Sequence, residues 1–427
     1  MSETSARPLE PGLRLRLSLM MFLQYAIWGA WLPILYPFLL GHRGFSLDQC
    51  GLILGGGALG AVIGPFIAGQ VADRYFATER FLGVSHILGA GLVWVLADVD
   101  SFTPFLALSV LYGIVYAPTL ALTNSLAFHH LPDRDRDFGS IRLWGTIGWI
   151  AVGIAMGQWL RITHTPDGTA EAIQAAQDAG RADAFRLSAF LGFFMGVFCF
   201  TLPHTPPMKG ESKSATFTAL GSIARQPLLT LFLLAVPISI IHQFYFVFTS
   251  DFLSGYGRDA ANAINKVFGV GGGGLMTIGQ MSEIFVLALI PFVAKSLSRK
   301  SLLGIGIAAY ALRMALFAYT DSLATVLLGV ALHGVCFGCF IFVAFMVVDE
   351  ETSPDVRASA QNLFNLVIVG VGIAVGSVVS TAIGGLAATD DGMDYPKLFS
   401  YPMWAALGCL VLLFFLYPSR SRASSTS

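Results

Sequence analysis

The sequence predicts an all-α membrane protein of twelve transmembrane helices that form two halves of six. Two observations predict this class. Hydrophobic residues make up 55% of the 427-residue chain and charged residues 12%, about half of the roughly 25% that soluble domains carry. Apolar runs of about 20 residues, the length of a bilayer-spanning helix, also recur along the whole chain. The net charge of -1 gives no reason to expect nucleic acid as a partner.

The apolar runs place the spans in order, each bounded by polar or charged residues. The first run follows a polar tail, Met1 to Arg14, and is too long for the apolar part of a signal peptide, so we expect it to stay in the protein. The twelve expected spans are 15–41, 49–72, 81–98, 104–130, 139–160, 185–203, 227–253, 267–294, 301–319, 322–348, 358–387 and 397–417.

Two of the connections between these spans are long and polar. Residues 161–184 show no helical periodicity and are expected to form a loop, whereas residues 204–226 contain two Pro and two Lys and divide the chain into halves. The expected organisation is a cytoplasmic tail (1–14), a six-helix bundle (15–203), a cytoplasmic linker (204–226), a second six-helix bundle (227–417) and a cytoplasmic tail (418–427).

The distribution of Lys and Arg orients the spans, because basic residues are retained on the cytoplasmic side of a membrane. If the N-terminus lies inside, the cytoplasmic segments hold most of the 25 basic residues. Both termini are therefore expected in the cytoplasm, and the chain is expected to cross the inner (plasma) membrane many times.

Short motifs recur at corresponding loops of the two halves. Gly69-x-x-x-Asp73-Arg74 follows the second span and resembles the signature loop of the major facilitators. Asp135-Arg136-Asp137 precedes the fifth span, and Asp355-Val-Arg357 precedes the eleventh. Such repetition is common in transporters built from internal repeats, so the sequence predicts a 6+6 major facilitator fold.

Polar groups deep in apolar spans are the candidate site, because an unpartnered charge in hydrocarbon costs at least roughly 2.5–3.5 kcal/mol. Arg142, Thr146 and Trp149 are spaced i, i+4 and i+7 in the fifth span and share one helical stripe. Gln280 and Glu283, spaced i and i+3, lie in the middle of the eighth span. Together they offer a cation, an amide, a carboxylate and an aromatic face.

Further candidates lie in the seventh and tenth spans. Gln243 is followed at i+3 by Phe246, and His333 shares a face with Phe337 at i+4. Arg313 stands alone in the ninth span. Structural interpretations remain open: Glu283 could neutralise Arg313 or Arg142, Arg142 could extend to the cytoplasmic surface, and His242 or His333 could only join two helices.

This set of side chains suits a nucleoside. Amide and carboxylate groups hydrogen-bond vicinal hydroxyls, and aromatic faces stack on a heterocyclic base. In a cavity of low dielectric constant a carboxyl group binds a proton more readily than in water, which makes Glu283 a candidate proton carrier. Proton symport is then the expected energy source, because the sequence contains no nucleotide-binding domain.

Other motifs are interpreted as packing features. Gly269-x-Gly271-x-x-Gly274 matches a dinucleotide fingerprint, but no strand precedes it. Gly56-x-x-x-Gly60-x-x-x-Gly64 indicates a helix–helix contact. Cys336 and Cys339 form an isolated CxxC pair within an apolar run. No metal set, cofactor or catalytic constellation is expected, so the chain is not expected to be an enzyme.

Taken together, the motifs resemble those of the nucleoside:proton symporter family of the major facilitator superfamily, over essentially the whole chain. The resembling stretches are Phe22–Trp31, Tyr116–Asn124, Ile141–Gly148, Gln280–Glu283, Leu312–Tyr319 and Arg357–Gln361. The resemblance implies that a bound nucleoside is contacted by six residues: Arg142, Thr146, Gln243, Gln280, Glu283 and Phe337. Among these, Gln280 and Glu283 would bind the ribose.

Four positions depart from the family pattern. Trp149 replaces a phenylalanine, Phe246 an asparagine, His333 a tyrosine, and Gly338 an aspartate linked to proton coupling. The resemblance therefore leaves the base preference open, and it leaves three alternatives for proton coupling: Glu283, His333 or no coupling. Transport of another polyhydroxylated solute such as a sugar is the alternative, and a membrane sensor is a third. A monomer is expected.

Overall fold

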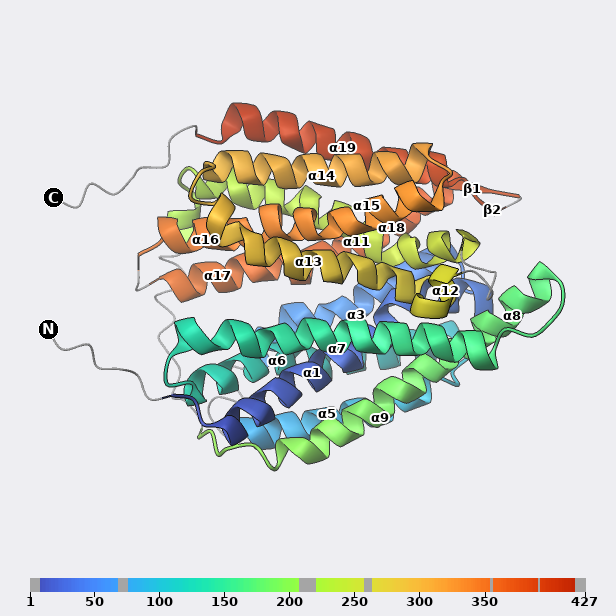
Figure 1. Cartoon of the computed structure of the whole chain (residues 1–427), viewed down its shortest axis with the longest axis horizontal. Helices are drawn as coiled ribbons and strands as arrows, with labels where there is room; N and C mark the ends of the chain where they lie inside the picture. Colours follow the sequence, from blue (N-terminus) through green and yellow to red (C-terminus); the bar gives the residue numbers. More distant parts are fainter. Residues whose placement is uncertain are drawn as a thin grey trace, which may run out of the picture. The chain divides into compact units, whose positions relative to one another are not determined.

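The computed structural model describes residues 8–67, 76–206, 220–256, 263–353, 356–390 and 392–418. Within these ranges eleven helices are long and apolar enough to cross a membrane, which agrees with the predicted all-α membrane class (Figure 1). The second expected span, 49–72, is represented by α3 (Leu47–Ile67), and its last residues lie outside the described ranges. The Gly69–Arg74 motif and most of the predicted linker also lie outside them.

The chain divides into two compact units. Unit 1 comprises residues 1–210 and 253–277, and unit 2 comprises residues 211–252 and 278–427. Two helices, α11 (Leu228–Tyr256) and α13 (Gly273–Val293), therefore run from one unit into the other.

Unit 1 is built from helices whose neighbours come from distant parts of the sequence. Its first span is continuous from Pro11 to His42. α1 packs on α7 and α9, α3 packs on α6, and α5 packs on α6 and α9. Its elements are α1 (Pro11–Trp31), η1 (Leu32–Ile34), α2 (Leu35–Pro37), η2 (Phe38–His42), α3, α5 (Thr78–Leu96), α6 (Phe102–His130), α7 (Arg134–Thr163), α8 (Ala170–Gly180), α9 (Ala182–Cys199) and α12 (Ala263–Phe268).

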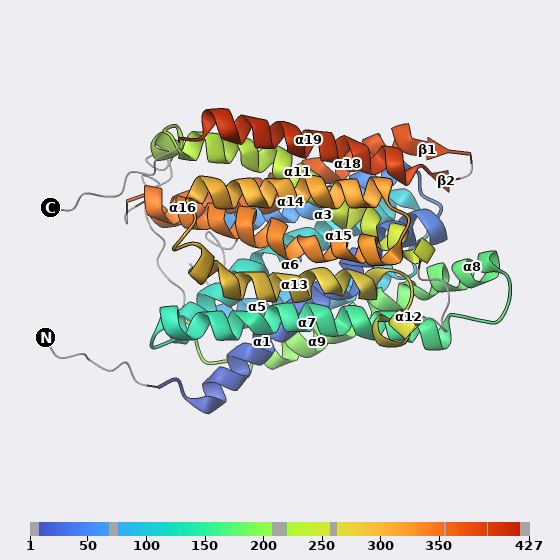
Figure 2. The same ribbon diagram turned by 45° about the horizontal axis from the view of Figure 1, so that its top comes forward.

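Unit 2 places α14 between α15 and α19, as Figure 2 shows. Besides α11 and α13, its elements are α14 (Arg299–Tyr319), α15 (Leu323–Cys336), η4 (Phe337–Phe342), α16 (Val343–Glu351), α17 (Arg357–Asn365), η5 (Leu366–Val371), α18 (Gly372–Ala387), β1 (Ala388–Thr389), β2 (Gly392–Met393) and α19 (Tyr395–Leu416). The antiparallel pair β1–β2 connects α18 to α19. The π-helical segments η4 and η5 interrupt the tenth and eleventh spans.

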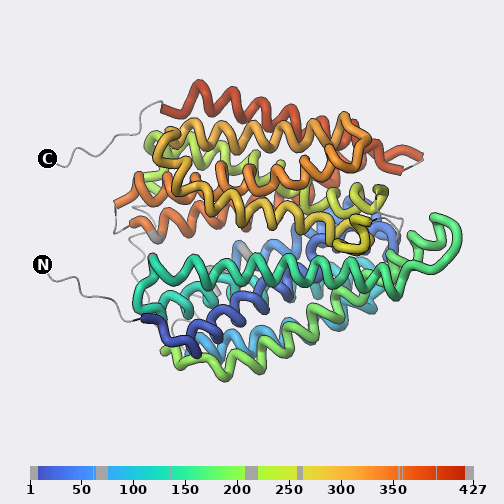
Figure 3. Tube along the Cα trace, in the orientation of Figure 1, coloured from blue at the N-terminus to red at the C-terminus, as the bar shows by residue number. Residues whose placement is uncertain are grey.

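The prediction of a loop over residues 161–184 was wrong, because α8 occupies part of it (Figure 3). The Thr169 hydroxyl accepts a hydrogen bond from Ala172 N and caps the helix. The buried side of α8 consists of Gln177, Asp178 and Gly180. The helix is amphipathic, so the expectation of no helical periodicity was also wrong. With 11 residues and low mean hydropathy, α8 is too short and too polar to be found in a search for apolar runs of about 20 residues.

A glycine-rich hairpin between α12 and α13 packs against the end of α7. Val270 N donates a hydrogen bond to Gly157 O at 3.0 Å, and Gln158 Nε2 donates to Lys266 O at 2.9 Å. Gly269 has a φ of 78°, which other residues adopt with strain. The packing interpretation of Gly269–Gly274 is thus confirmed, although α13 begins six residues later than the expected span.

Two of the three glycines of the predicted α3 packing motif, Gly56 and Gly60, also pack as predicted. A Cβ atom at Gly60 would collide with the backbone of Gly113 on α6, and a Cβ atom at Gly56 would lie 2.9 Å from Leu106. The two helices can therefore approach closely only because these side chains are absent.

Candidate functional site

The candidate residues divide between the two units. Arg142, Thr146 and Trp149 belong to unit 1 and lie on the uninterrupted helix α7, as the i, i+4, i+7 spacing requires. The others belong to unit 2 and lie on three helices and a π-helical segment: Gln243 and Phe246 on α11, Gln280 and Glu283 on α13, His333 on α15, and Phe337 on η4.

In unit 1, glycines bring α7 close to α1. A Cβ atom at Gly145 would lie 2.6 Å from the Tyr25 ring, and one at Gly29 would lie 2.9 Å from the Trp149 indole. The close approach creates two contacts that the sequence did not predict. The guanidinium carbon of Arg142 lies 4.0 Å from the centre of the Tyr25 ring, a cation–π contact.

The Trp149 indole meets Trp28 edge to face, with ring centres 5.5 Å apart. Thr146 is half-buried on the same helix, between Arg142 and Trp149 in the sequence. The α7 stripe therefore carries a cation held by an aromatic ring at one end and a pair of indoles at the other.

In unit 2, glycines bring α13 close to α15. A Cβ atom at Gly279 would lie 2.9 Å from His333 Cβ, and a Cβ atom at Gly334 would collide with Ser282. This close packing sets His333 Nε2 3.8 Å from Glu283 Oε2. The His333 side chain is 2% exposed and the Glu283 side chain is 15% exposed. The imidazole is therefore shielded from solvent, whereas solvent can reach part of the Glu283 side chain.

Arg313 on α14 completes this cluster through His333, whereas the sequence suggested only Glu283 as its partner. Its side chain is fully buried, and its NH1 lies 3.3 Å from His333 Nδ1. The guanidinium also lies over the rings of Tyr245 and Tyr310, 4.5 and 5.0 Å from their centres. The sequence signal was present, because Arg313 is an ionisable residue deep in a span, but nothing in the sequence named its neighbour.

Aromatic rings surround His333. Phe246 lies 5.9 Å from His333 and 5.2 Å from His242, measured between ring centres. Tyr245 stacks on His333 at 4.7 Å. Phe246 therefore belongs to the cluster around His333, and it packs where the family pattern has an amide.

The two candidate glutamines differ in their hydrogen bonding. Gln243 Nε2 donates to Ser377 Oγ at 3.0 Å, which ties α11 to α18. Gln280 is 5% exposed, and its Oε1 accepts no hydrogen bond from the described part of the chain. A buried carbonyl oxygen without a donor is uncommon in native proteins, so Gln280 stays a candidate for contact with a ligand.

Phe337 is half-buried and begins the π-helical segment η4. Single π-helical turns in α-helices are frequent at functional sites. The next residue, Gly338, packs on α13, because a Cβ atom there would lie 2.7 Å from Val286 Cγ1. The position at which the family pattern has an acid is therefore filled by the neighbouring helix.

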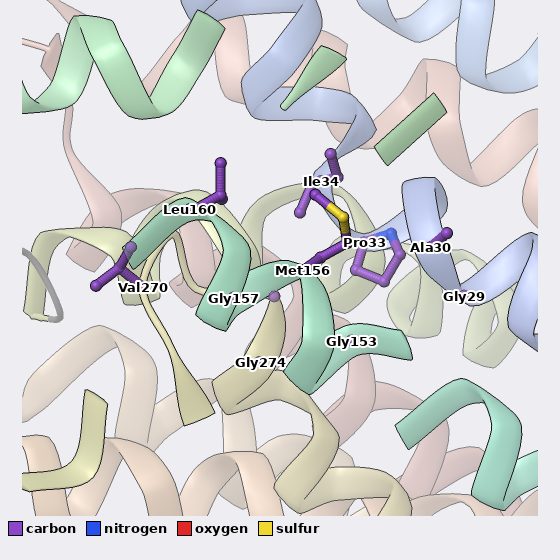
Figure 4. Close-up of a pocket in the computed structure, with 11 residues that line it drawn as sticks. Gly29, Ala30, Pro33, Ile34, Gly153, Met156, Gly157, Leu160, Val270 and Gly274 are labelled. Carbon is purple, nitrogen blue, oxygen red and sulfur yellow. The ribbon is translucent and has the colours of Figure 1, made fainter. Parts of the chain in front are cut away.

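A small apolar pocket in unit 1 is not part of this arrangement. It lies between α1, α7 and the start of α13, and Figure 4 shows it lined by Ala30, Ile34, Met156 and several glycines. It encloses about 10 Å³, room for one water molecule at most. No group of three or more His, Cys, Asp or Glu side chains suited to a metal occurs among the described residues.

Comparison with known proteins identifies relatives along nearly the whole chain. A family model described as "Nucleoside H+ symporter" matches residues 12–420. The putative nucleoside transporter YegT of Escherichia coli (strain K12) is 35% identical over 90% of this chain and 85% of its own length. The nucleoside permease NupG of the same organism is 28% identical over 86% of this chain and 87% of its own length.

Solved structures show the same fold. A crystal structure of nucleoside transporter NupG superimposes with a TM-score of 0.81 at 24% identity, over 95% of this chain and all of that one. An inward-facing bacterial homologue of the lysosomal transporter Spinster gives a TM-score of 0.69 at 16% identity. The predicted twelve-helix major facilitator fold is confirmed. With a match that extends over nearly its full length, the chain belongs to the nucleoside H+ symporter family, whose members are membrane transporters and not enzymes.

Proposed function

We propose that this protein imports nucleosides across the inner membrane by symport with protons. One observation carries the proposal beyond family membership. On α13, Gln280 Oε1 is buried and has no hydrogen-bond partner within the described ranges, and Gln280 lies one helical turn from Glu283. Two acceptors at this spacing suit the two vicinal hydroxyls of a ribose, because each hydroxyl can donate one hydrogen bond.

The remaining candidates supply the other contacts. The exposed parts of Arg142, Thr146 and Trp149, together with Gln243, Phe246, His333 and Phe337, are proposed to meet the base and the rest of the sugar. Trp149 offers a larger stacking face than a phenylalanine. Phe246 offers no hydrogen bond, so stacking is expected to contribute more to base recognition than hydrogen bonding does.

Proton coupling is assigned to Glu283. In proteoliposomes with an inward proton gradient, we expect the unaltered protein to accumulate uridine or adenosine above the external concentration. Glu283→Gln should remove this accumulation while exchange without a gradient persists, because the amide keeps the ribose hydrogen bonds. Glu10→Gln, a change at an exposed residue before α1, is the matched control. Accumulation by the unaltered protein that ignores the gradient would contradict proton symport.

The alternative of a sugar substrate is tested in the same assay. Uridine and adenosine should compete with each other for uptake, and a monosaccharide should not. If the monosaccharide alone competes, the polar pair on α13 binds hydroxyls of a different solute.

Orientation is part of the proposal. Both termini and the linker between the halves are placed in the cytoplasm. A C-terminal tag should therefore resist protease in sealed right-side-out vesicles and be cut in inverted ones.

A further inference from the structure

Arg313 is a buried cation, and no carboxylate among the described residues is in direct contact with it. The side chain is fully buried, and its Nε and NH2 have no hydrogen-bond partner within the described part of the chain. Its NH1 has one polar neighbour among the described side chains, His333 Nδ1 at 3.3 Å. Such a residue is expensive to keep in a membrane protein, which points to a role beyond packing.

The hydrogen-bond donors and acceptors of Arg313 and His333 determine which ring nitrogen of His333 carries hydrogen. A guanidinium has N–H donors and no acceptor, and it stays charged. His333 Nδ1 must therefore offer its lone pair to Arg313. A neutral imidazole carries its single hydrogen on the other nitrogen, and that nitrogen, Nε2, lies 3.8 Å from Glu283 Oε2. Protonation of Nδ1 would set two N–H donors against each other.

We propose that Arg313 is a positioning residue that holds His333 as a neutral Nε2–H donor directed at Glu283, so that the transported proton is carried by Glu283 alone. This inference rests on the proposed symport. The proton binds to and leaves a carboxylate oxygen of Glu283, and no bond to a His333 nitrogen is made or broken. When the proton has left, a small approach turns the 3.8 Å contact into an N–H···O⁻ hydrogen bond.

Other titratable groups also face His333. His242 and Tyr245 on α11 lie 5.3 and 4.7 Å from His333 between ring centres. The hydroxyl of Tyr310 on α14 forms a hydrogen bond with His242 Nδ1 at 2.7 Å. Cys336, one turn along α15, is buried. Among the described groups around the ring, Arg313 is a fixed positive charge and Glu283 an acid, so these two set the hydrogen positions.

Histidine labelled with ¹⁵N provides the test, because ring nitrogens with and without hydrogen have different chemical shifts. The chain has 8 histidines, and the His333 signals are assigned as those missing from His333→Gln. In the unaltered protein, reconstituted without nucleoside, we expect His333 to keep hydrogen on Nε2 only across pH 5 to 8, the range in which free histidine titrates. Hydrogen on Nδ1 at any pH in this range would overturn the inference.

Variants then test the part played by Arg313. Arg313→Gln should give mixed tautomers or a titrating ring, and should lower proton-driven accumulation by about tenfold, the effect of losing one charge-assisted hydrogen bond. Exchange without a gradient should change far less. Arg181→Gln removes an equally buried arginine of unit 1 and should leave the His333 signals unchanged. An unchanged His333 spectrum in Arg313→Gln would overturn the positioning role.

The two proposals fail separately. The tautomer is read in the unaltered protein, and His333→Gln serves only to assign the His333 signals. The labelling experiment needs no nucleoside, so a negative uptake assay overturns the proposed function without affecting the hydrogen positions. A titrating His333 in a protein that accumulates nucleoside overturns only the inference.

Discussion

Each unit buries one histidine between helices, His86 in unit 1 and His333 in unit 2. The two histidines differ in how closely their polar neighbours contact them. In unit 1, His86 Nε2 lies 2.9 Å from Gln24 Oε1, and Gln24 Nε2 donates to Thr119 Oγ1 at 2.8 Å. The Thr119 hydroxyl donates in turn to Tyr116 O at 2.6 Å. In unit 2, the contacts of His333 with Arg313 and Glu283 are longer, 3.3 and 3.8 Å.

The difference separates a structural network from a candidate site. In the network around Gln24, each polar hydrogen is directed at one acceptor. These hydrogen bonds hold α1, α5 and α6 in fixed positions against one another. The unit 2 cluster keeps unused hydrogen-bonding capacity on Arg313 and Gln280 within the described residues. A buried donor or acceptor that has no protein partner can form a hydrogen bond with a ligand.

The Gln24 network gives the largest expected effect on stability. Gln24→Leu leaves His86 and Thr119 without their buried partner, and we expect the free energy of unfolding to fall by about 3 kcal/mol. A double-mutant cycle with His86→Leu should recover part of the loss, because the second change removes an unpaired group. The melting temperature in detergent measures this. Strictly additive losses would show that the network does not act as a unit.

The glycine contact of η4 with α13 gives the next effect. Gly338→Asp restores the acid of the family pattern, but its Cβ would lie 2.7 Å from Val286 Cγ1. We expect a loss of about 2 kcal/mol from overpacking. Val286→Ala in the same chain should recover most of it. Equal melting temperatures for Gly338→Asp and the unaltered protein would mean that the two helices separate easily.

The smallest expected effects distinguish the two glutamines. Gln243→Leu breaks the bond to Ser377 and should lower the free energy of unfolding by about 1 kcal/mol. Gln280→Leu removes an acceptor that has no donor in the described structure, so stability should hold or rise slightly. The stabilisation of Gln280→Leu by added nucleoside should be weaker than that of the unaltered protein, and thermal shift measures both. A large loss of stability in Gln280→Leu would place it with the structural groups.

The fold was predictable because each span is a separate signal of length and hydropathy, and the expected ends that fall on described residues lie within six residues of the ends of the helices. Membership of Glu283 and His333 in one cluster was only suggested, since periodicity assigns residues to a face of a helix but not to a partner helix. For that reason the contact of Arg313 with His333 and the contact of Tyr25 with Arg142 were missed. The glycines Gly334 and Gly338, spaced i and i+4, carried the missing information, because they mark the face of α15 and η4 that meets α13.

The hairpin before α13 offers an experimental readout without any probe attached. The Val270 amide hydrogen bonds to the Gly157 carbonyl, and neither Gly157 nor Gly269 has room for a side chain. The amide precedes a helix that begins in unit 1 and continues in unit 2. Its rate of exchange with deuterium therefore reports how often the end of α7 and the start of α13 separate. Comparing that rate in the presence and absence of a proton gradient would show whether this junction opens and closes during the transport cycle.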